Sequence, residues 1–256
     1  MKKPLLSLMN VKLKKINNEE VKPRIKGKKK PFSHIVAEPY ANIFICGRKR
    51  SGKTNVADHL IRHLMNVDKD LVLVVFSKTL HKDEIWNLLR KKYEKKGRFL
   101  GFSSLEDKMD ENSPKGIFDQ LIEEHLNQGA LDDEETLKWI FVFDDFSEEL
   151  KDKRINHFVK VNRWMPSFNI FSSQFCLDLK PEARKQIGLW LLFPQIEKEK
   201  LFQIYQSADP PTDFETFLRL YKDATNERYN FLYMDAVNGT FRKNFNKKYI
   251  IEDFEN

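Results

Sequence analysis

The chain has 256 residues, of which 41% are hydrophobic and 32% are charged, and its formal net charge is +7. This length suits one α/β domain with a sizeable core, with or without an arm attached. The longest apolar runs are residues 71–76, 139–143 and 189–193, all far shorter than a membrane span. The apolar stretch after the basic N-terminus is also too short for a signal peptide. We therefore expect no membrane partner and no secretion.

The positive charge is concentrated at the N-terminus. Residues 1–30 hold eleven Lys or Arg and two Glu, a balance of +9, so the rest of the chain carries −2. We therefore predict a basic, flexible arm over residues 1–34 and one folded domain over residues 35–256. Such an arm favours contact with nucleic acid or another polyanion, although a solvated tail or a nuclear-localisation-like signal remains an alternative. Cys46 and Cys176 show no metal-ligand spacing and are expected to be reduced core thiols.

The first predicted strand, Asn42–Cys46, leads directly into the most informative motif of the chain. The sequence GRKRSGKT at residues 47–54 fits G-x-x-x-x-G-K-[ST], the P-loop pattern, and a helix is predicted over residues 53–66. The glycines let backbone amides point at phosphate oxygens, Lys53 would reach the β- and γ-phosphates, and Thr54 would bind Mg²⁺. We expect nucleotide contacts from Gly47, Arg48, Lys49, Arg50, Ser51, Gly52, Lys53, Thr54 and Asn55.

Strands and helices alternate along the rest of the domain. The predicted strands cover residues 71–76, 98–102, 138–143, 168–173 and 189–193. The predicted helices cover residues 82–93, 117–127, 148–162, 181–186, 196–206 and 214–224. Residues 231–237 and 240–244 flank Asn238-Gly239, which predicts a C-terminal β-hairpin with a type I′ turn. This order predicts an α/β fold, a three-layer sandwich with a largely parallel central sheet.

Two adjacent carboxylates follow the apolar strand at residues 139–143. This is the Walker B pattern, in which Asp144 would hold Mg²⁺ and Asp145 would act as general base toward the attacking water. Taken alone, two acids after a strand could be turn residues. The strand at residues 71–76 separates the P-loop from these acids, which is the order of RecA-like P-loop NTPases with a catalytic acid. A GTPase is disfavoured because no N-K-x-D motif is present.

Three further polar residues are candidates for the catalytic machinery. Gln174 ends the strand after Walker B, where an amide can sense the γ-phosphate or orient water, although it could also be an ordinary strand-end residue. Arg163 precedes that strand and Arg184 follows it. Either could reach a neighbouring subunit's nucleotide as an arginine finger, and a surface arginine without a role is the alternative.

Together these motifs resemble a known family. GRKRSGKT, WIFVFDD, Arg163-Trp164 upstream of NIFSSQ, and LKPEAR at residues 179–184 are similar to the genome-packaging ATPases of the poxvirus and virophage type. These are FtsK-HerA-like P-loop ATPases, and the resemblance covers about residues 40–245. Trp164 stands where members often have His, and Gln186 where they often have Asn, which weakens transfer of the arginine role.

The resemblance implies an ATP-hydrolysing, Mg²⁺-dependent motor that pumps double-stranded DNA into a preformed capsid. It implies a ring of five or six copies, capsid proteins as further partners, and a location in the virion or the infected cell, in the cytoplasm or a viral factory. Gln174 would be the polar sensor and Arg184 the candidate for action in trans.

Two other functions remain open from the residues alone. A nucleoside or nucleotide kinase would need an arginine-rich lid over its acceptor, whereas Arg90 and Arg98 are isolated. A non-catalytic DNA-binding scaffold is disfavoured because Lys53, Thr54 and Asp144 are all present.

Overall fold

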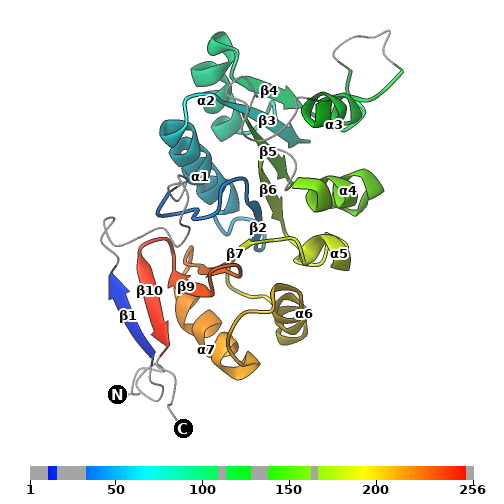
Figure 1. Cartoon of the computed structure of the whole chain (residues 1–256). Helices are drawn as coiled ribbons and strands as arrows, with labels where there is room; N and C mark the ends of the chain where they lie inside the picture. The colour runs from blue at the N-terminus through cyan, green and yellow to red at the C-terminus, as the bar shows by residue number, and fades with distance from the viewer. Residues whose placement is uncertain (1–10, 16–32, 109–113, 128–137, 163–166, 252–256) are drawn as a thin grey trace.

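A computed structural model describes residues 11–15, 33–108, 114–127, 138–162 and 167–251. Its centre is one ten-stranded sheet in the order β1-β10-β9-β8-β7-β2-β6-β5-β3-β4 (Figure 1). Six adjacent strands are parallel: β4 (Phe99–Phe102), β3 (Leu71–Ser77), β5 (Lys138–Asp144), β6 (Ser167–Ser173), β2 (Asn42–Cys46) and β7 (Leu189–Leu192). The other four are antiparallel: β8 (Leu232–Asp235), β9 (Thr240–Lys243), β10 (Lys247–Ile251) and β1 (Val11–Lys15).

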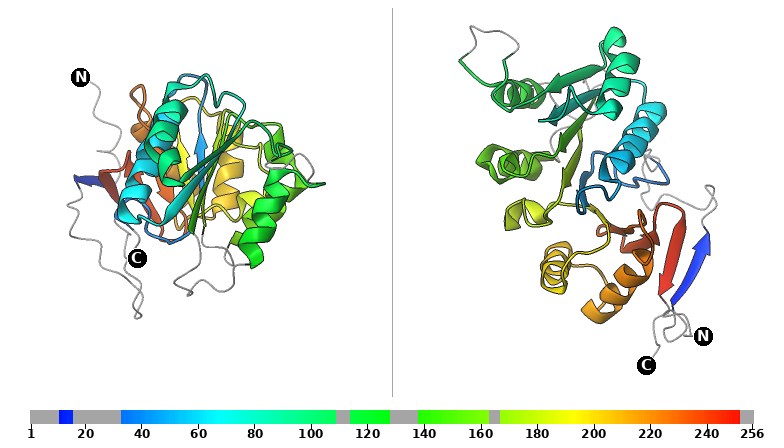
Figure 2. Two further views of the ribbon diagram at one scale, coloured as in Figure 1. Left: turned by 90° about the horizontal axis from the view of Figure 1, so that it is seen from above. Right: turned by 180° about the vertical axis from the view of Figure 1, so that it is seen from behind.

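Helices cover both faces of the sheet, which confirms the predicted three-layer α/β fold (Figure 2). One face carries α1 (Lys53–Val67) and α2 (Glu84–Tyr93), with η2 (Glu94–Lys96) after them. The other carries α3 (Ile117–Asn127), α4 (Lys153–Val161), α5 (Pro181–Arg184), α6 (Lys198–Ala208) and α7 (Phe214–Ala224). Within the described residues, no helix combines the length and apolar character needed to cross a bilayer.

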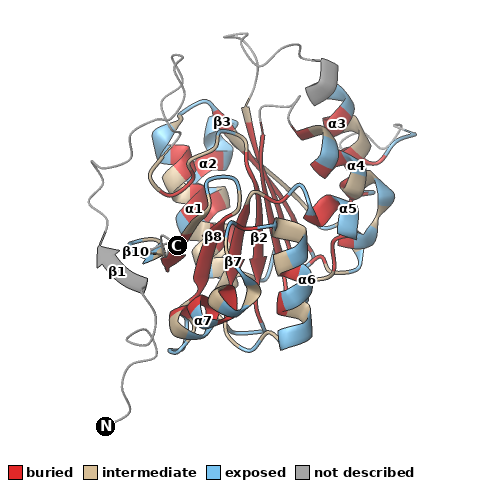
Figure 3. Cartoon of the chain, turned by 60° about the horizontal axis from the view of Figure 1, so that its bottom comes forward, coloured by how far each residue is buried: buried red, intermediate tan, exposed pale blue. Residues whose placement is uncertain are grey.

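The central strands read as continuous apolar runs because both of their faces are buried (Figure 3). In β5, Trp139, Phe141 and Phe143 pack under α3 and α4, whereas Ile140 and Val142 pack under α1 and α2. Successive side chains point to opposite faces of a strand, so one hydrophobic run supplies two separate cores.

Stacked phenylalanines brace the carboxyl ends of three neighbouring strands. The rings of Phe76 and Phe143 stack with centroids 5.2 Å apart, and those of Phe143 and Phe171 stack at 5.1 Å. Each such pair contributes about 0.5–1.5 kcal/mol beyond the burial of its area. The strand ends that carry the polar residues of the predicted site are therefore held rigidly together.

The predicted helix at residues 148–162 is divided in two. A short turn, η3 (Glu149–Lys151), precedes α4, and Asp152 between them adopts an extended backbone with φ −60° and ψ 141°. Its carboxylate accepts a hydrogen bond from the Arg154 amide at 2.8 Å and so forms the N-cap of α4. Helical periodicity alone did not reveal this capping residue.

The C-terminal hairpin is confirmed, but its turn differs from the prediction. The register pairs Asp235 with Thr240, so the loop has four residues rather than the two of a type I′ turn. The Asp235 carboxylate accepts a hydrogen bond from the Asn238 amide at 2.9 Å, and the Ala236 amide donates to the Gly188 carbonyl at 2.9 Å. These bonds end the ladder before a tight turn can form.

Two strands at the antiparallel edge were not predicted. β10 pairs with β9, and β1, from within the predicted flexible arm, pairs antiparallel with β10. The register sets Lys14 opposite Lys248 and Lys15 opposite Lys247. This edge of the sheet therefore concentrates lysines from both ends of the chain.

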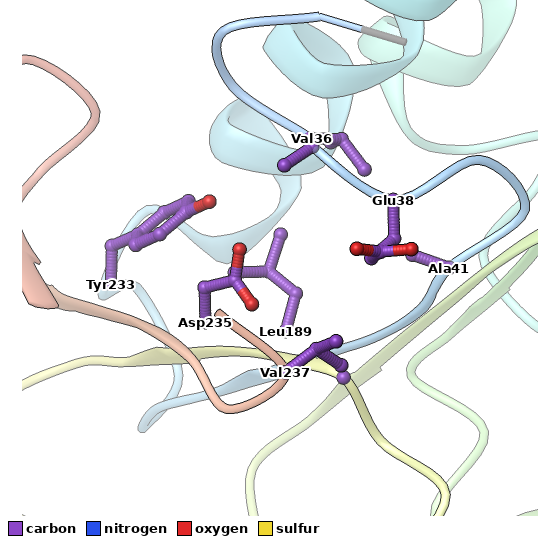
Figure 4. A pocket seen from close by; sticks show the side chains of 9 residues that line it. Val36, Glu38, Ala41, Leu189, Tyr233, Asp235 and Val237 are labelled. Carbon is purple, nitrogen blue, oxygen red and sulfur yellow. The ribbon is translucent and has the colours of Figure 1, made fainter. Parts of the chain in front are cut away.

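The chain segment before β2 packs against the sheet end opposite the P-loop. Ile35 and Val36 are buried, and the Tyr233 hydroxyl donates to the Ile35 carbonyl at 2.9 Å. In Figure 4, Val36 and Glu38 lie across a small pocket from Tyr233 and Asp235. Residues 35 and 36 thus pack against the body of the sheet.

Candidate nucleotide-binding site

Three parallel strands bring the predicted site residues to one edge of the sheet. The register places Cys46 opposite Ser173 and Asp144 opposite both Ser172 and Ser77. The P-loop follows β2, the carboxylates end β5, and Gln174 follows β6. Ligands of open α/β sheets bind beyond this carboxyl edge.

The P-loop turns sharply after β2. Arg50 and Gly52 adopt the left-handed region, with φ 63° and 99°. Gly47 is required for a different reason, because a Cβ there would lie 2.5 Å from Phe193 Cβ and 2.7 Å from the Ser51 hydroxyl oxygen. That hydroxyl is buried and has no hydrogen-bond partner among the described residues. A tight loop with an unpaired hydroxyl inside it fits a phosphate ligand.

The Lys53 side chain lies over this loop. Its ammonium donates to the carbonyl oxygens of Gly47 at 2.7 Å and Arg48 at 3.1 Å. Burial lowers the pKa of Lys53, and the Asp144 carboxylate opposes this shift. With the exposed cations Arg48, Lys49 and Arg50, the loop presents a concentrated positive field to anions.

Thr54 and Asp144 meet across the gap between α1 and β5. The Thr54 hydroxyl oxygen lies 3.4 Å from Asp144 Oδ2. Asp144 is only 5% exposed; burial raises its pKa, and the Lys53 ammonium opposes this shift. A hydroxyl and a carboxylate are the hard oxygen ligands that Mg²⁺ uses together with nucleotide phosphates.

The fit to magnesium rests on these two oxygens. Among the described residues, no three His, Cys, Asp or Glu side chains cluster as a metal site of their own. A cation would therefore depend on Thr54, Asp144 and the phosphates of a nucleotide, as in other P-loop proteins.

Asp145 occupies a different environment from its neighbour. It is exposed, and its φ of 54° is left-handed, a conformation that Asp tolerates better than most residues. The Gln174 side-chain amide donates to Asp145 Oδ1 at 3.4 Å. The structure thus brings together the carboxylate and the amide for which the sequence predicts catalytic roles.

A hydrogen-bond chain behind Gln174 was not predicted. The Ser173 hydroxyl donates to the Asp178 carboxylate, lies 3.1 Å from the Ser147 hydroxyl, and accepts from the Phe175 amide at 3.2 Å. The Ser173 carbonyl also accepts from the Gly47 amide at 3.1 Å. This chain fixes the start of the P-loop relative to the Gln174 loop. The paired serines ending β6 were the available sequence signal.

Of the two arginine-finger candidates, the structure describes Arg184 alone. Arg184 is 7% exposed, and its Nη1 donates to the Leu179 carbonyl at 3.5 Å. Burial lowers its pKa. The role of Arg184 in trans stays a prediction. It would require the guanidinium to leave its buried position and turn outward from α5. Arg163 lies outside the described residues.

No protein-family model matches the sequence, and no curated protein matches it. Solved structures do match. The genome-packaging NTPase B204 of Sulfolobus turreted icosahedral virus 2, in complex with AMP, is 17% identical with a TM-score of 0.57, over 84% of this chain and 100% of that chain.

Two other structures extend this likeness. B204, the DNA-packaging ATPase of Sulfolobus turreted icosahedral virus, is 20% identical with a TM-score of 0.56, over 80% of this chain and 96% of that one. EssC (ATPases 2 and 3) of Geobacillus thermodenitrificans is 15% identical with a TM-score of 0.55, over 85% of this chain and 41% of that one. At these identities the comparisons establish the shared P-loop ATPase fold.

Proposed function

We propose that this chain hydrolyses ATP. The observation that carries the proposal is the 3.4 Å approach of the Thr54 hydroxyl to Asp144, beside a P-loop whose lysine already lies over the loop. Magnesium and a nucleoside triphosphate need these oxygens and this cation at one place. The ATP-γS complex known for the similar B204 NTPase supports ATP as the ligand.

Each side chain has a distinct task in this proposal. Bound Mg²⁺–ATP supplies the γ-phosphoryl group that water attacks. Lys53 exchanges its two carbonyl partners for phosphate oxygens, and the Ser51 hydroxyl gains the partner that it lacks. Exposed Asp145 accepts the proton of the attacking water, and Gln174, bonded to the same carboxylate, orients that water.

We further propose that hydrolysis drives double-stranded DNA into a viral capsid, with copies of this chain forming a ring of five or six. The fold shared with B204 over that protein's full length supports this role. Capsid proteins would then be partners.

We propose that DNA contacts the lysine-rich edge formed by β1 and β10. Lys247 and Lys248 are exposed there, and the register sets Lys15 and Lys14 opposite them. Lysine contacts to phosphate make binding weaken steeply with salt. Replacing Lys247 and Lys248 with Glu should weaken DNA binding and reduce its salt slope. The exposed lysines of η2, 95 and 96, provide a matched charge-reversal control at the opposite end of the sheet.

A triplex-displacement assay tests the translocase proposal. The protein should strip a third-strand oligonucleotide from linear duplex DNA when ATP is present, and should not do so with ATP-γS. Lys53→Ala should remove this activity. ATP turnover without displacement would contradict translocation, and phosphoryl transfer to a nucleoside instead of water would point to a kinase.

A further inference from the structure

The layout of the site fixes the direction in which a bound nucleotide must run. Asp145 and Gln174 follow β5 and β6, on one side of the P-loop strand β2. On the other side of β2 lie β7 and β8. If the terminal phosphate faces the carboxylate and the amide, the base must extend toward β7 and β8. This step rests on the proposed function, because it takes the P-loop as the phosphate site.

An exposed aromatic ring lies where that path leads. A Cβ built on Gly52 would meet Tyr229 Cδ1 at 3.4 Å and Phe193 Cε1 at 3.8 Å, so the Tyr229 ring borders the P-loop directly. Tyr229 belongs to the loop between α7 and β8 and is 54% exposed. A large aromatic side chain left exposed beside a ligand loop is available for contact with a ligand.

Side-chain hydrogen bonds hold the loop that carries Tyr229 in place. The Asn230 side chain donates to the Glu227 carboxylate at 3.1 Å and accepts from the Asn244 amide group at 2.8 Å. Asn244 Oδ1 in turn accepts from the Phe231 amide at 3.0 Å. Tyr229 itself has φ 69°, an unfavourable conformation for an aromatic residue. The surrounding bonds therefore hold the ring in a position that the backbone alone would not choose.

One face of the ring already carries a planar group. The guanidinium carbon of Arg228 lies 4.7 Å from the Tyr229 ring centroid, within cation–π range. Arg228 is exposed, so it can move aside at little cost. A purine base is likewise planar and stacks on aromatic rings.

We propose that Tyr229 is the base-stacking residue of this site, and that the purine base of the nucleotide takes the place occupied here by the Arg228 guanidinium. Tyr229 then contributes to the affinity for the base without acting on the phosphates. The ring, rather than the hydroxyl, provides the contact.

The test compares a ligand that has a base with one that lacks it. Calorimetry with Mg²⁺ measures the affinity for a non-hydrolysable ATP analogue and for inorganic tripolyphosphate. Tyr229→Ala should weaken binding of the analogue about tenfold, which corresponds to about 1.4 kcal/mol. It should leave tripolyphosphate binding unchanged. Tyr229→Phe should match the wild type, and so should Phe202→Ala, which removes another exposed aromatic, on α6.

Several outcomes would overturn the inference. Unchanged binding of the analogue by Tyr229→Ala would do so, as would an equal loss for both ligands, since the ring would then act through the P-loop. If Arg228→Ala weakened binding of the analogue as much as Tyr229→Ala and left tripolyphosphate binding unchanged, the contact would belong to the arginine instead. If the wild type bound neither ligand, the proposed function would fail as well, whereas a wild type that bound both would confine any failure to Tyr229.

Discussion

Replacing Gly47 with Ala tests how closely the P-loop is packed against the strand beside it. The new Cβ would lie 2.5 Å from Phe193 Cβ, whereas non-bonded carbons rest at about 3.5–4.0 Å. The two segments must therefore separate by about 1 Å. Phe193 is fully buried, its amide donates to the Cys46 carbonyl at 2.8 Å, and its carbonyl accepts from the Tyr221 hydroxyl at 2.8 Å. Because Phe193 is fixed in this way, the P-loop is expected to move.

Overpacking of this kind costs about 1–3 kcal/mol of unfolding free energy. For a domain of this size each kcal/mol lowers the Tm by about 2–4 °C, so a loss of about 2–12 °C is expected. The loss of ATP affinity should be the larger effect, because the displaced residue begins the loop that receives the phosphates.

Thermal melts and calorimetric titration with a non-hydrolysable ATP analogue measure both effects. Gly97→Ala is the matched control, since Gly97 has φ 66° and a Cβ added there would have no atom within 4 Å. It should lose about 1–2 kcal/mol to backbone strain and keep its nucleotide affinity. A Gly47→Ala protein with the wild-type Tm and wild-type affinity would contradict the close packing of Gly47 against Phe193.

Three further predictions concern chemistry, DNA and pH. Asp145→Asn should keep nucleotide binding, because Asn also tolerates positive φ, but should lose turnover in a phosphate-release assay; retained turnover would place the base elsewhere. Deleting residues 1–34 should weaken DNA binding and flatten its salt dependence, and an unchanged slope would exclude contact between this segment and phosphate. Burial lowers the pKa of His34 and His63, whose rings are 5.1 Å apart, and the charge of Arg242 lowers the pKa of His34 further. The unfolded chain therefore binds more protons below about pH 6.5, so urea melts should show stability falling from pH 7 to pH 5, and a flat profile would contradict this.

The sequence predicted the parts of the site that depend on local pattern. The P-loop, the carboxylates after β5 and the strand–helix alternation follow from spacing and apolar runs, and the structure places them at one sheet edge. Because parallel strands of a P-loop fold end together, residues that follow different strands could be assigned to one site from their order in the chain.

The features that could not be predicted from the sequence depend on contacts between distant segments of the chain. β10 has the sequence KKYII, whose two exposed lysines give little apolar signal, and it forms because β9 and β1 flank it. The burial of Arg184 is decided by helix packing that no local pattern records. Tyr229 and Gly52 are about 180 residues apart in the sequence. They lie close together because the α7–β8 loop folds back toward the P-loop.

Steady-state ATP hydrolysis by the purified protein, with and without linear double-stranded DNA, is the most direct test of the proposed ATP-driven DNA motor. We predict turnover that rises when DNA is added and disappears in Lys53→Ala. The melting temperature of this variant should stay close to that of the wild type, because the hydrogen bonds of the Lys53 side chain within the described residues are to loop carbonyls. Full turnover in a folded Lys53→Ala protein would contradict the assignment of this loop as the ATP site, and turnover indifferent to DNA would contradict the DNA motor.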